Sequence, residues 1–190
     1  PLQDRGVKVW GVEPAKNVAK IANDNGIYTI NKYFDRNTFE DIGIFGFDLI
    51  TASNVFAHAD DLKGIVKNAF GVLNEGATFI VEVQYLLDTI NDLTFDNIYH
   101  EHVNYWSVTS INNFFNSLHL NVVDVEHVDT HGGSIRVYVQ KNGVVEKSVG
   151  EFLQTEEEFG LTEYSTYRDF ANRVERCKIN VINNINELKK

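Results

Sequence analysis

The residues best suited to chemistry lie close together at positions 95–107, FDNIYHEHVNYWS. This stretch combines histidines, a glutamate, amides and aromatic rings, and no other part of the chain is as chemically dense. Inside a regular helix or strand, such a mixture would bury polar groups at a substantial cost in free energy unless each was paired. The composition therefore predicts an ordered loop that lines a cleft, and this loop is the candidate active site.

Three interpretations of the loop compete. In the first, His102 is a general base oriented by an acid such as Glu101, while Tyr99 donates a hydrogen bond to a developing oxyanion. In the second, His100 and His102 bind a metal ion, with His131 or Glu101 as a third ligand. A single His-x-His pattern is a weak metal signal because the spacing fixes no third ligand. In the third, the aromatic rings are core residues and the histidines are a polar rim.

Other candidate residues follow apolar strand-like runs. Glu13 ends one such run just before Pro14, where a carboxylate can accept both hydroxyls of a ribose, although a solvated glutamate is the simpler explanation. Asn54 and His58 follow the run FDLITA and offer an amide and a group that titrates near neutral pH. Helix capping and an ordinary surface histidine are the corresponding alternatives.

A glycine-rich turn gives a third candidate, formed by His131, Gly132 and Gly133 before Ser134. Two glycines allow positive φ or a close approach of the backbone, and successive amides there could receive a phosphate or carboxylate. A hairpin turn that simply needs glycine is the alternative.

Apolar periodicity predicts the elements that position these groups. Strands are expected at 6–13, 27–30, 47–52 and 78–83, alternating with helices at 15–25 and 62–73. A helix at 108–118, a hairpin of strands 121–127 and 134–140, and a helical tail at 164–190 follow. Such alternation predicts an α/β fold whose sheet is mostly parallel with an antiparallel C-terminal hairpin, and ligands bind beyond the carboxyl ends of parallel strands. We expect an α/β domain at 1–145 and a helical extension at 146–190.

Composition narrows the function classes. The 190 residues carry a net charge of −10, which argues against a nucleic-acid-binding protein. The single cysteine, Cys177, excludes an intramolecular disulfide and suits a reducing compartment, so a cytoplasmic location is expected. No apolar run approaches the ~20 residues that span a bilayer, so no membrane partner is expected. The absence of methionine suggests a piece of a longer protein.

The order of motifs resembles the family of SAM-dependent sugar C-methyltransferases that act on nucleotide-linked deoxysugars. The resemblance rests on GVEP, ASNVFAH, FIVEV, FDNIYHEHVNYWS and VDTHGGSIRVYV, and it extends from about Val9 to Val139. The pairing of an IYxEH segment with an HGGS turn is its most specific feature. It implies a partial Rossmann-like class I methyltransferase sheet plus a long C-terminal helix.

The resemblance also implies roles for individual residues. Glu13 would hold the ribose of S-adenosyl-L-methionine, Phe34 would lie near its adenine, and Asn54 would border its methionine end. On the substrate side, His102 would abstract a proton beside a keto group of the sugar. The residues that would position the sugar or stabilise the enolate are Tyr99, Glu101 and His58, and the turn that would contact the substrate is His131, Gly132 and Gly133. In this interpretation, no metal ion takes part.

The chain also departs from the family pattern. Its members begin with a cysteine-rich zinc domain and a first strand with a glycine-rich turn, and they continue into a further α/β domain. The missing first strand would lie between the strands that start near Val7 and Phe47, so its absence leaves unpaired edges. We expect the two strands to close up, or a second copy or preceding residues to fill the gap. The leading hypothesis is a core fragment whose isolated activity is doubtful, and the alternatives are a non-catalytic nucleotide- or sugar-binding module and, less favoured, a histidine-based metal enzyme.

Overall fold

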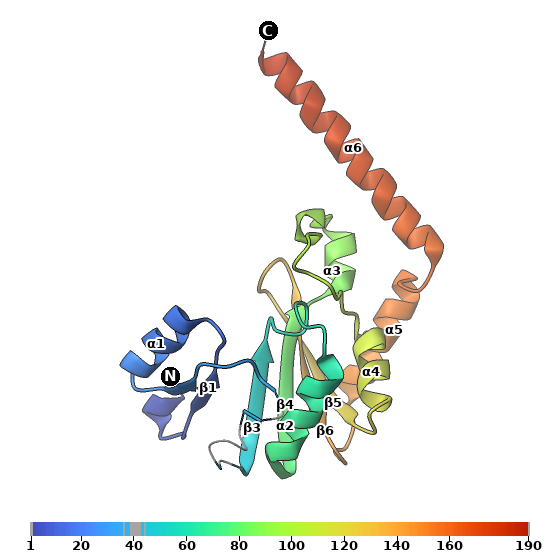
Figure 1. Ribbon diagram of the computed structural model, residues 1–190. Coiled ribbons are helices and arrows are strands. Elements are labelled where there is room, and N and C mark those ends of the chain that lie inside the picture. Colours follow the sequence, from blue (N-terminus) through green and yellow to red (C-terminus); the bar gives the residue numbers. More distant parts are fainter. Residues whose placement is uncertain (1, 36, 39–42, 44, 190) are drawn as a thin grey trace. The chain divides into compact units, whose positions relative to one another are not determined.

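The expected order of strands and helices is present in the computed structural model of the chain (Figure 1). The structure describes residues 2–35, 37, 38, 43 and 45–189. These residues form two compact units. The first unit contains residues up to Asp48 together with Asp61–Asn74, and the second contains Leu49–Asp60 together with the residues from Glu75 onwards.

The first unit contains a short parallel sheet. Its elements up to residue 30 are η1 (Gln3–Arg5), β1 (Trp10–Val12), α1 (Lys16–Asp24) and β2 (Tyr28–Ile30). The strands β1 and β2 pair in parallel, with Trp10 opposite Tyr28. Asn23 near the end of α1 ties the helix to β2, because its side chain accepts from the Thr29 amide at 3.0 Å and donates to the Thr29 carbonyl at 2.9 Å. The first strand, expected at 6–13, is shorter than the sequence pattern suggests, because β1 comprises only Trp10–Val12.

The helix α2 (Leu62–Val72) also belongs to the first unit and begins where the sequence predicts. The Asp61 side chain accepts a hydrogen bond from the Gly64 amide at 2.8 Å, which caps the first turn. Val66, Ala69 and Val72 are buried at helical spacing, as an amphipathic helix requires.

A second sheet has the strand order β3-β4-β6-β5. Its strands are β3 (Phe47–Ser53), β4 (Leu73–Gln84), β5 (Asn121–Val128) and β6 (Ser134–Gln140). The strand β6 pairs antiparallel with both β4 and β5, which confirms the expected C-terminal hairpin. Among the described residues, β1 and β3 belong to different sheets.

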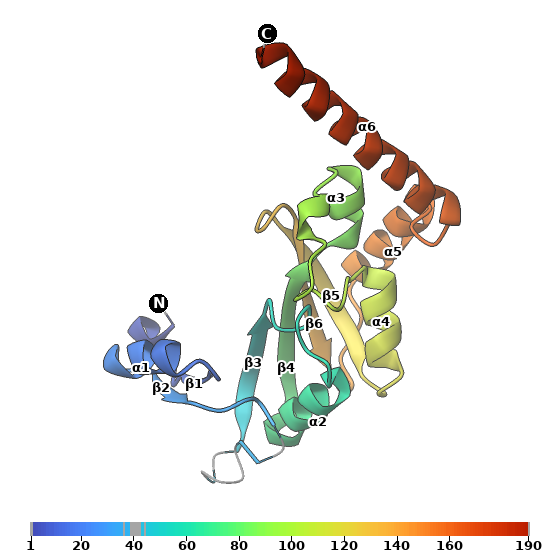
Figure 2. The same ribbon diagram turned by 45° about the horizontal axis from the view of Figure 1, so that its top comes forward.

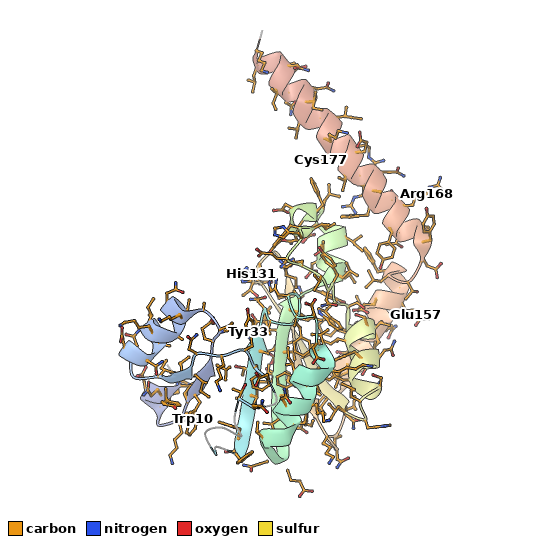
Figure 3. The ribbon with its side chains drawn as sticks, in the orientation of Figure 1. Trp10, Tyr33, His131, Glu157, Arg168 and Cys177 are labelled. Carbon is orange, nitrogen blue, oxygen red and sulfur yellow. The ribbon has the colours of Figure 1, made fainter. Side chains whose placement is uncertain are left out.

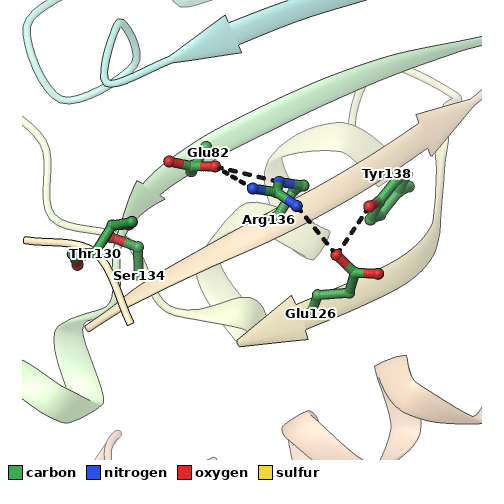
Figure 4. A network of polar contacts seen from close by, with 6 residues as sticks. All are labelled: Glu82, Glu126, Thr130, Ser134, Arg136 and Tyr138. Carbon is green, nitrogen blue, oxygen red and sulfur yellow. Dashed lines mark hydrogen bonds and ion pairs between the residues drawn. The ribbon is translucent and has the colours of Figure 1, made fainter. Parts of the chain in front are cut away.

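The two faces of the second sheet differ in polarity. Val81 and Val83 of β4 and Val137 of β6 are buried on one face. On the other face, Arg136 forms ion pairs with Glu82 at 2.8 Å and with Glu126 at 3.4 Å (Figure 4). These three residues are opposite one another on adjacent strands, so alternation along each strand produces a polar row across the sheet.

Four α-helices among the described residues complete the second unit. They are α3 (Leu86–Asn91), α4 (Val108–Asn116), α5 (Lys147–Phe159) and α6 (Tyr164–Leu188). The predicted start of α4 is confirmed, since Ser107 and Ser110 form a capping box. Both α4 and α5 pack beside β5, and they also contact each other (Figure 2). Lys190, the last residue of the expected tail helix, lies outside the described residues.

A buried carboxylate joins α5 to the start of α4. Glu156 on α5 is 2% exposed. Its two carboxylate oxygens accept hydrogen bonds from the amides of Val108 at 2.5 Å and Thr109 at 2.8 Å. These amides belong to the first turn of α4, which has no carbonyl partners of its own within the helix. The negative charge is therefore paired with the positive end of the α4 dipole.

None of the helices in the described residues combines the length and apolar character needed to cross a lipid bilayer.

Candidate active site

Two segments distant in sequence meet in the second unit. One is the 95–107 stretch, which contains the short helix η3 (Phe95–Asn97) and then runs irregularly to the start of α4. The other is the segment 54–59 that follows β3. The Ala57 carbonyl accepts from the Val103 amide at 2.9 Å and the Asn104 amide at 3.2 Å, so the irregular stretch is hydrogen-bonded in place. This agrees with the predicted ordered loop.

Phe56 anchors the second segment in the core. Its side chain is fully buried and contacts the rings of Phe79, Trp106 and Phe115. Two residues earlier, Asn54 has φ of 56°, a left-handed conformation that asparagine tolerates better than most residues. The chain therefore turns sharply at the end of β3, buries Phe56 and returns His58 to the surface.

His58 and His102 form an adjacent pair, with ring centroids 4.7 Å apart. The Nδ1 atom of His58 lies 2.9 Å from the Glu101 carbonyl oxygen, and Nδ1 of His102 lies 2.9 Å from the Asn97 carbonyl oxygen. A carbonyl oxygen can only accept a hydrogen bond, so each Nδ1 carries the hydrogen. In the neutral rings, Nε2 is consequently the basic nitrogen.

Tyr99 completes this cluster. Its hydroxyl lies 3.0 Å from Nε2 of His102, and since that nitrogen holds the lone pair in the neutral ring, the hydroxyl donates. The Tyr99 side chain is 43% exposed and His58 is also exposed, so a ligand can reach both groups. The geometry supplies a base and a hydroxyl donor within one hydrogen bond of each other.

Glu101 takes part through its backbone. Its carbonyl oxygen holds His58, whereas its carboxylate lies 3.8 Å from Nε2 of His100. The group that orients His102 is the Asn97 carbonyl. Sequence reasoning could not identify this acceptor, because any residue offers a carbonyl oxygen and only the fold decides which one a side chain meets.

The glycine turn packs on β4 and α3. The Gly133 carbonyl accepts from the Tyr85 amide at 3.1 Å, and the His131 carbonyl accepts from Gln84 Nε2 at 3.3 Å. Gly133 has φ of 106°, and a Cβ atom there would collide with the carboxylate of Asp88. His131 is exposed on this turn between β5 and β6 (Figure 3). Close packing against Asp88 therefore explains why position 133 is a glycine. The exposed face of the turn remains accessible to a ligand.

Asp88 also binds His127, a histidine that belongs to none of the candidate motifs. Its Oδ2 atom lies 2.7 Å from Nε2 of His127 on β5, and the Asp88 side chain is 17% exposed. This pair joins the start of α3 to the hairpin that carries the glycine turn. No sequence motif predicted it, since the two residues are separated by 39 positions.

The expected cofactor residues are divided between the two units. Glu13 and Phe34 belong to the first unit, and Asn54 belongs to the second. One carboxylate oxygen of Glu13 accepts from the Ala15 amide at 2.7 Å, while Asn31 Nδ2 donates to the Glu13 carbonyl at 2.9 Å. The backbone N–H of Asn54 donates to the Glu82 carbonyl at 2.8 Å, so the side chain of Asn54 is not used in this hydrogen bond.

The metal hypothesis finds no site in the part of the chain that the structure describes. No group of three or more histidine, cysteine, aspartate or glutamate side chains there is placed to hold a metal ion. The His100 side chain is 89% exposed and points its Nε2 toward Glu101.

Comparison with known proteins identifies the class. Residues 1–125 match the methyltransferase domain family, and the chain belongs to this family. Residues 129–190 match the C-methyltransferase C-terminal domain. Among curated proteins, the chain is 38% identical over 185 residues to C-methyltransferase NovU from Streptomyces niveus. That comparison covers 95% of this chain and 44% of NovU, so the chain spans less than half the length of this relative.

Solved structures show the same fold at low sequence identity. A possible histamine N-methyltransferase from Thermotoga maritima aligns with a TM-score of 0.54 and 16% identity, covering 70% of this chain and 73% of that one. Magnesium protoporphyrin IX methyltransferase from Synechocystis PCC 6803, solved with bound SAH, gives a TM-score of 0.56 and 9% identity, covering 75% and 67%. The expected class I methyltransferase fold is confirmed, as are the methyltransferase family and its cofactor, S-adenosyl-L-methionine.

Proposed function

We propose that this chain is the core of a SAM-dependent C-methyltransferase that acts on a carbon beside a keto group of a nucleotide-linked deoxysugar. The observation that carries the proposal is the His58–His102 pair. A backbone carbonyl accepts a hydrogen bond from Nδ1 of each ring, which leaves Nε2 of each neutral ring as the basic nitrogen. The match to the C-methyltransferase C-terminal domain and the similarity to NovU support transfer to carbon.

The chemical step follows from the acidity of such a carbon. Nε2 of His102 takes the proton, and the electron pair of the C–H bond moves to form an enolate, whose negative charge develops on the keto oxygen. Tyr99 is the hydroxyl donor nearest to His102 and would stabilise that charge. His58, whose Nε2 carries the lone pair in the neutral ring, would accept a hydrogen bond from a sugar hydroxyl and so position the substrate. When bound, S-adenosyl-L-methionine would supply the electrophilic methyl group for the enolate carbon, with S-adenosylhomocysteine as the leaving group.

The cofactor would be held by Glu13, Phe34 and Asn54. Glu13 directly follows β1 and uses one carboxylate oxygen for the Ala15 amide, so its second oxygen suits a ribose hydroxyl. Asn54 is held in a left-handed conformation at the end of β3. Ligands of open α/β sheets bind at such carboxyl ends, which is where all three residues occur along the chain.

The substrate would be positioned by Glu101 and by the turn of His131, Gly132 and Gly133. His131 and Gly132 are exposed, and both have positive φ, which turns successive backbone groups outward. A cytoplasmic location and a second copy or preceding residues beside the sheet edges are parts of the same proposal.

The decisive experiment compares proton abstraction with cofactor binding in the complete protein. We expect His102→Ala to lower turnover about 10²–10⁴-fold, as loss of a general base does, while the Kd for S-adenosyl-L-methionine changes little. Deuterium uptake from D2O by a nucleotide-linked keto-deoxysugar, followed by NMR, reports the first step separately from methylation.

The control is His100→Ala, which removes an 89%-exposed histidine from the same loop and should leave both quantities unchanged. Equal losses of turnover and cofactor binding in His102→Ala would indicate a structural histidine. Titration calorimetry that detects sugar-nucleotide binding without S-adenosyl-L-methionine binding would instead favour the non-catalytic binding module.

A further inference from the structure

The segment that carries His58 is tied to the loop that carries His102 through one residue, Asn104. We propose that Asn104 is a positioning residue, which sets the place of His58 relative to His102. The catalytic consequence of this role rests on the proposed function, whereas the structural role does not.

The side chain of Asn104 brackets His58. Its Nδ2 atom donates to the carbonyl of Phe56 at 3.3 Å and to the carbonyl of Ala59 at 3.1 Å. These two carbonyls lie on either side of His58 in the sequence. The backbone amide of Asn104 adds a bond of 3.2 Å to the Ala57 carbonyl. One residue thereby binds three carbonyl oxygens of the four-residue segment that contains His58.

Asparagine is suited to this task by its chemistry. Its amide group provides two hydrogens on one nitrogen, so a single short side chain satisfies two carbonyl oxygens at once. Aspartate has the same shape but only accepts hydrogen bonds, and its negative charge would face two carbonyl dipoles. The residue is half-buried, so water would replace the lost hydrogen bonds only in part.

The neighbouring contacts explain why position matters here. His58 donates from Nδ1 to the carbonyl of Glu101, which lies in the same loop as Asn104. If the 56–59 segment shifts, this hydrogen bond is lost, and Nδ1 is no longer favoured over Nε2 as the protonated nitrogen. Trp106 forms a longer hydrogen bond to the same segment, with 3.4 Å between its Nε1 and the Phe56 carbonyl oxygen. When the Asn104 hydrogen bonds are lost, the 56–59 segment should therefore shift rather than unfold.

The test uses Asn104→Asp, which keeps the shape and removes both donors, and Asn104→Ser, which keeps one smaller donor. Asn121→Asp is the matched control, because Asn121 Nδ2 also donates to a backbone carbonyl, that of Gly143 at 3.1 Å, from a half-buried position at the start of β5. Thermal melting of each variant verifies folding.

The first measurement is the tautomer of each histidine, obtained from long-range ¹H–¹⁵N correlations of the imidazole rings. In the unmodified protein, His58 and His102 should both carry hydrogen on Nδ1. In Asn104→Asp, His58 should become a mixture of tautomers while Asn121→Asp retains the original spectrum. A variant that only loses stability would not change the tautomer of the folded protein.

The second measurement is turnover by the complete protein with a nucleotide-linked keto-deoxysugar. We expect Asn104→Asp to lower kcat about 100-fold, since a misplacement of ~1 Å at a reacting centre has an effect of this order. The kcat of Asn104→Ser should lie between the kcat of Asn104→Asp and that of the unmodified protein. The KM for S-adenosyl-L-methionine should change by less than about threefold, because the cofactor does not depend on the placement of His58.

An unchanged His58 tautomer in folded Asn104→Asp, or turnover equal to that of Asn121→Asp, would overturn the proposal. If Asn104→Asp does not fold, Asn104→Ser decides between the same two outcomes. Failure of the proposed function is distinguishable: the unmodified protein would then show no deuterium uptake by any keto sugar, while the NMR measurement would still report on Asn104.

Discussion

At the scale of single residues, hydrogen-bond partners assign different roles to chemically similar side chains. His58 and His102 each meet a carbonyl oxygen at Nδ1, whereas the side chain of His100 is 89% exposed. His127 pairs with Asp88 at 2.7 Å. The same imidazole is therefore a candidate base in one place, a solvated group in another and the hydrogen-bond partner of a carboxylate in a third.

Tyr85 gives a prediction at this scale. It is 3% exposed, and its hydroxyl finds no hydrogen-bond partner among the described residues. Burial, and then the nearby Glu156 carboxylate, raise the pKa of Tyr85 above its ordinary value of 10.0. Below pH 10 both the folded and unfolded forms keep the proton. Above it, only the unfolded form ionises, so this residue makes stability decrease as the pH rises.

We expect Tyr85→Phe to change the free energy of unfolding by less than about 1 kcal/mol at pH 7, since it removes an unpaired hydroxyl. At pH 11 the variant should gain ~1.4 kcal/mol relative to the unmodified protein. Urea unfolding at both pH values measures the difference. Tyr164→Phe, at a 79%-exposed ring, is the control, and parallel pH profiles for Tyr85→Phe and the unmodified protein would contradict the assignment.

At the scale of elements, the site depends on how irregular segments are fixed. The stretch that follows η3 contains no strand or helix before α4, apart from an isolated bridge between Tyr85 and Trp106. Hydrogen bonds to the Ala57 carbonyl and the buried ring of Phe56 hold it instead. The loop is therefore held in one conformation by its contacts with the start of α4 and with the segment after β3.

The start of α4 gives a prediction at this scale. Glu156 satisfies two first-turn amides, those of Val108 and Thr109. Glu156→Gln keeps the shape, but it removes the charge and places an NH2 group opposite one amide N–H. We expect a loss of about 1–3 kcal/mol in unfolding free energy, because a buried donor loses its partner. Urea denaturation is the measurement.

The control is Glu157→Gln, which changes the exposed neighbour on the same helix (Figure 3) and should leave stability within about 0.5 kcal/mol. Equal effects of the two substitutions would show that Glu156 does not stabilise α4.

At the scale of the whole molecule, the chain divides into units of unequal size. In the part of the chain that the structure describes, the sheet of the first unit has two strands of three residues each, whereas the second sheet has four longer strands. A two-stranded sheet is marginally stable by itself. The chain also spans less than half the length of NovU.

Hydrogen exchange should therefore separate the two units. We expect backbone amides of Tyr28–Ile30 in β2 to exchange on the order of 100-fold faster than those of residues 79–83 in β4, because small, exposed units open at a lower free energy. Exchange followed by mass spectrometry of peptides measures both regions. Equal protection would mean that the two units unfold together.

The sequence by itself determined the elements, since hydrophobic periodicity and capping residues act locally. The helix beginning after Ser107, the hairpin of β5 and β6 and the dense 95–107 stretch are all legible in the order of residues. The order of motifs likewise indicates the methyltransferase family, to which the chain belongs.

Only the tertiary structure decided which groups meet. The placement of His58 beside His102 arises because Phe56 is buried under Trp106, and the bracket formed by Asn104 joins positions 45 to 48 residues apart. Such contacts involve backbone carbonyls, which every residue possesses, so no pattern of side chains records them. The physical reason is that packing of distant apolar residues fixes the geometry of the polar ones between them.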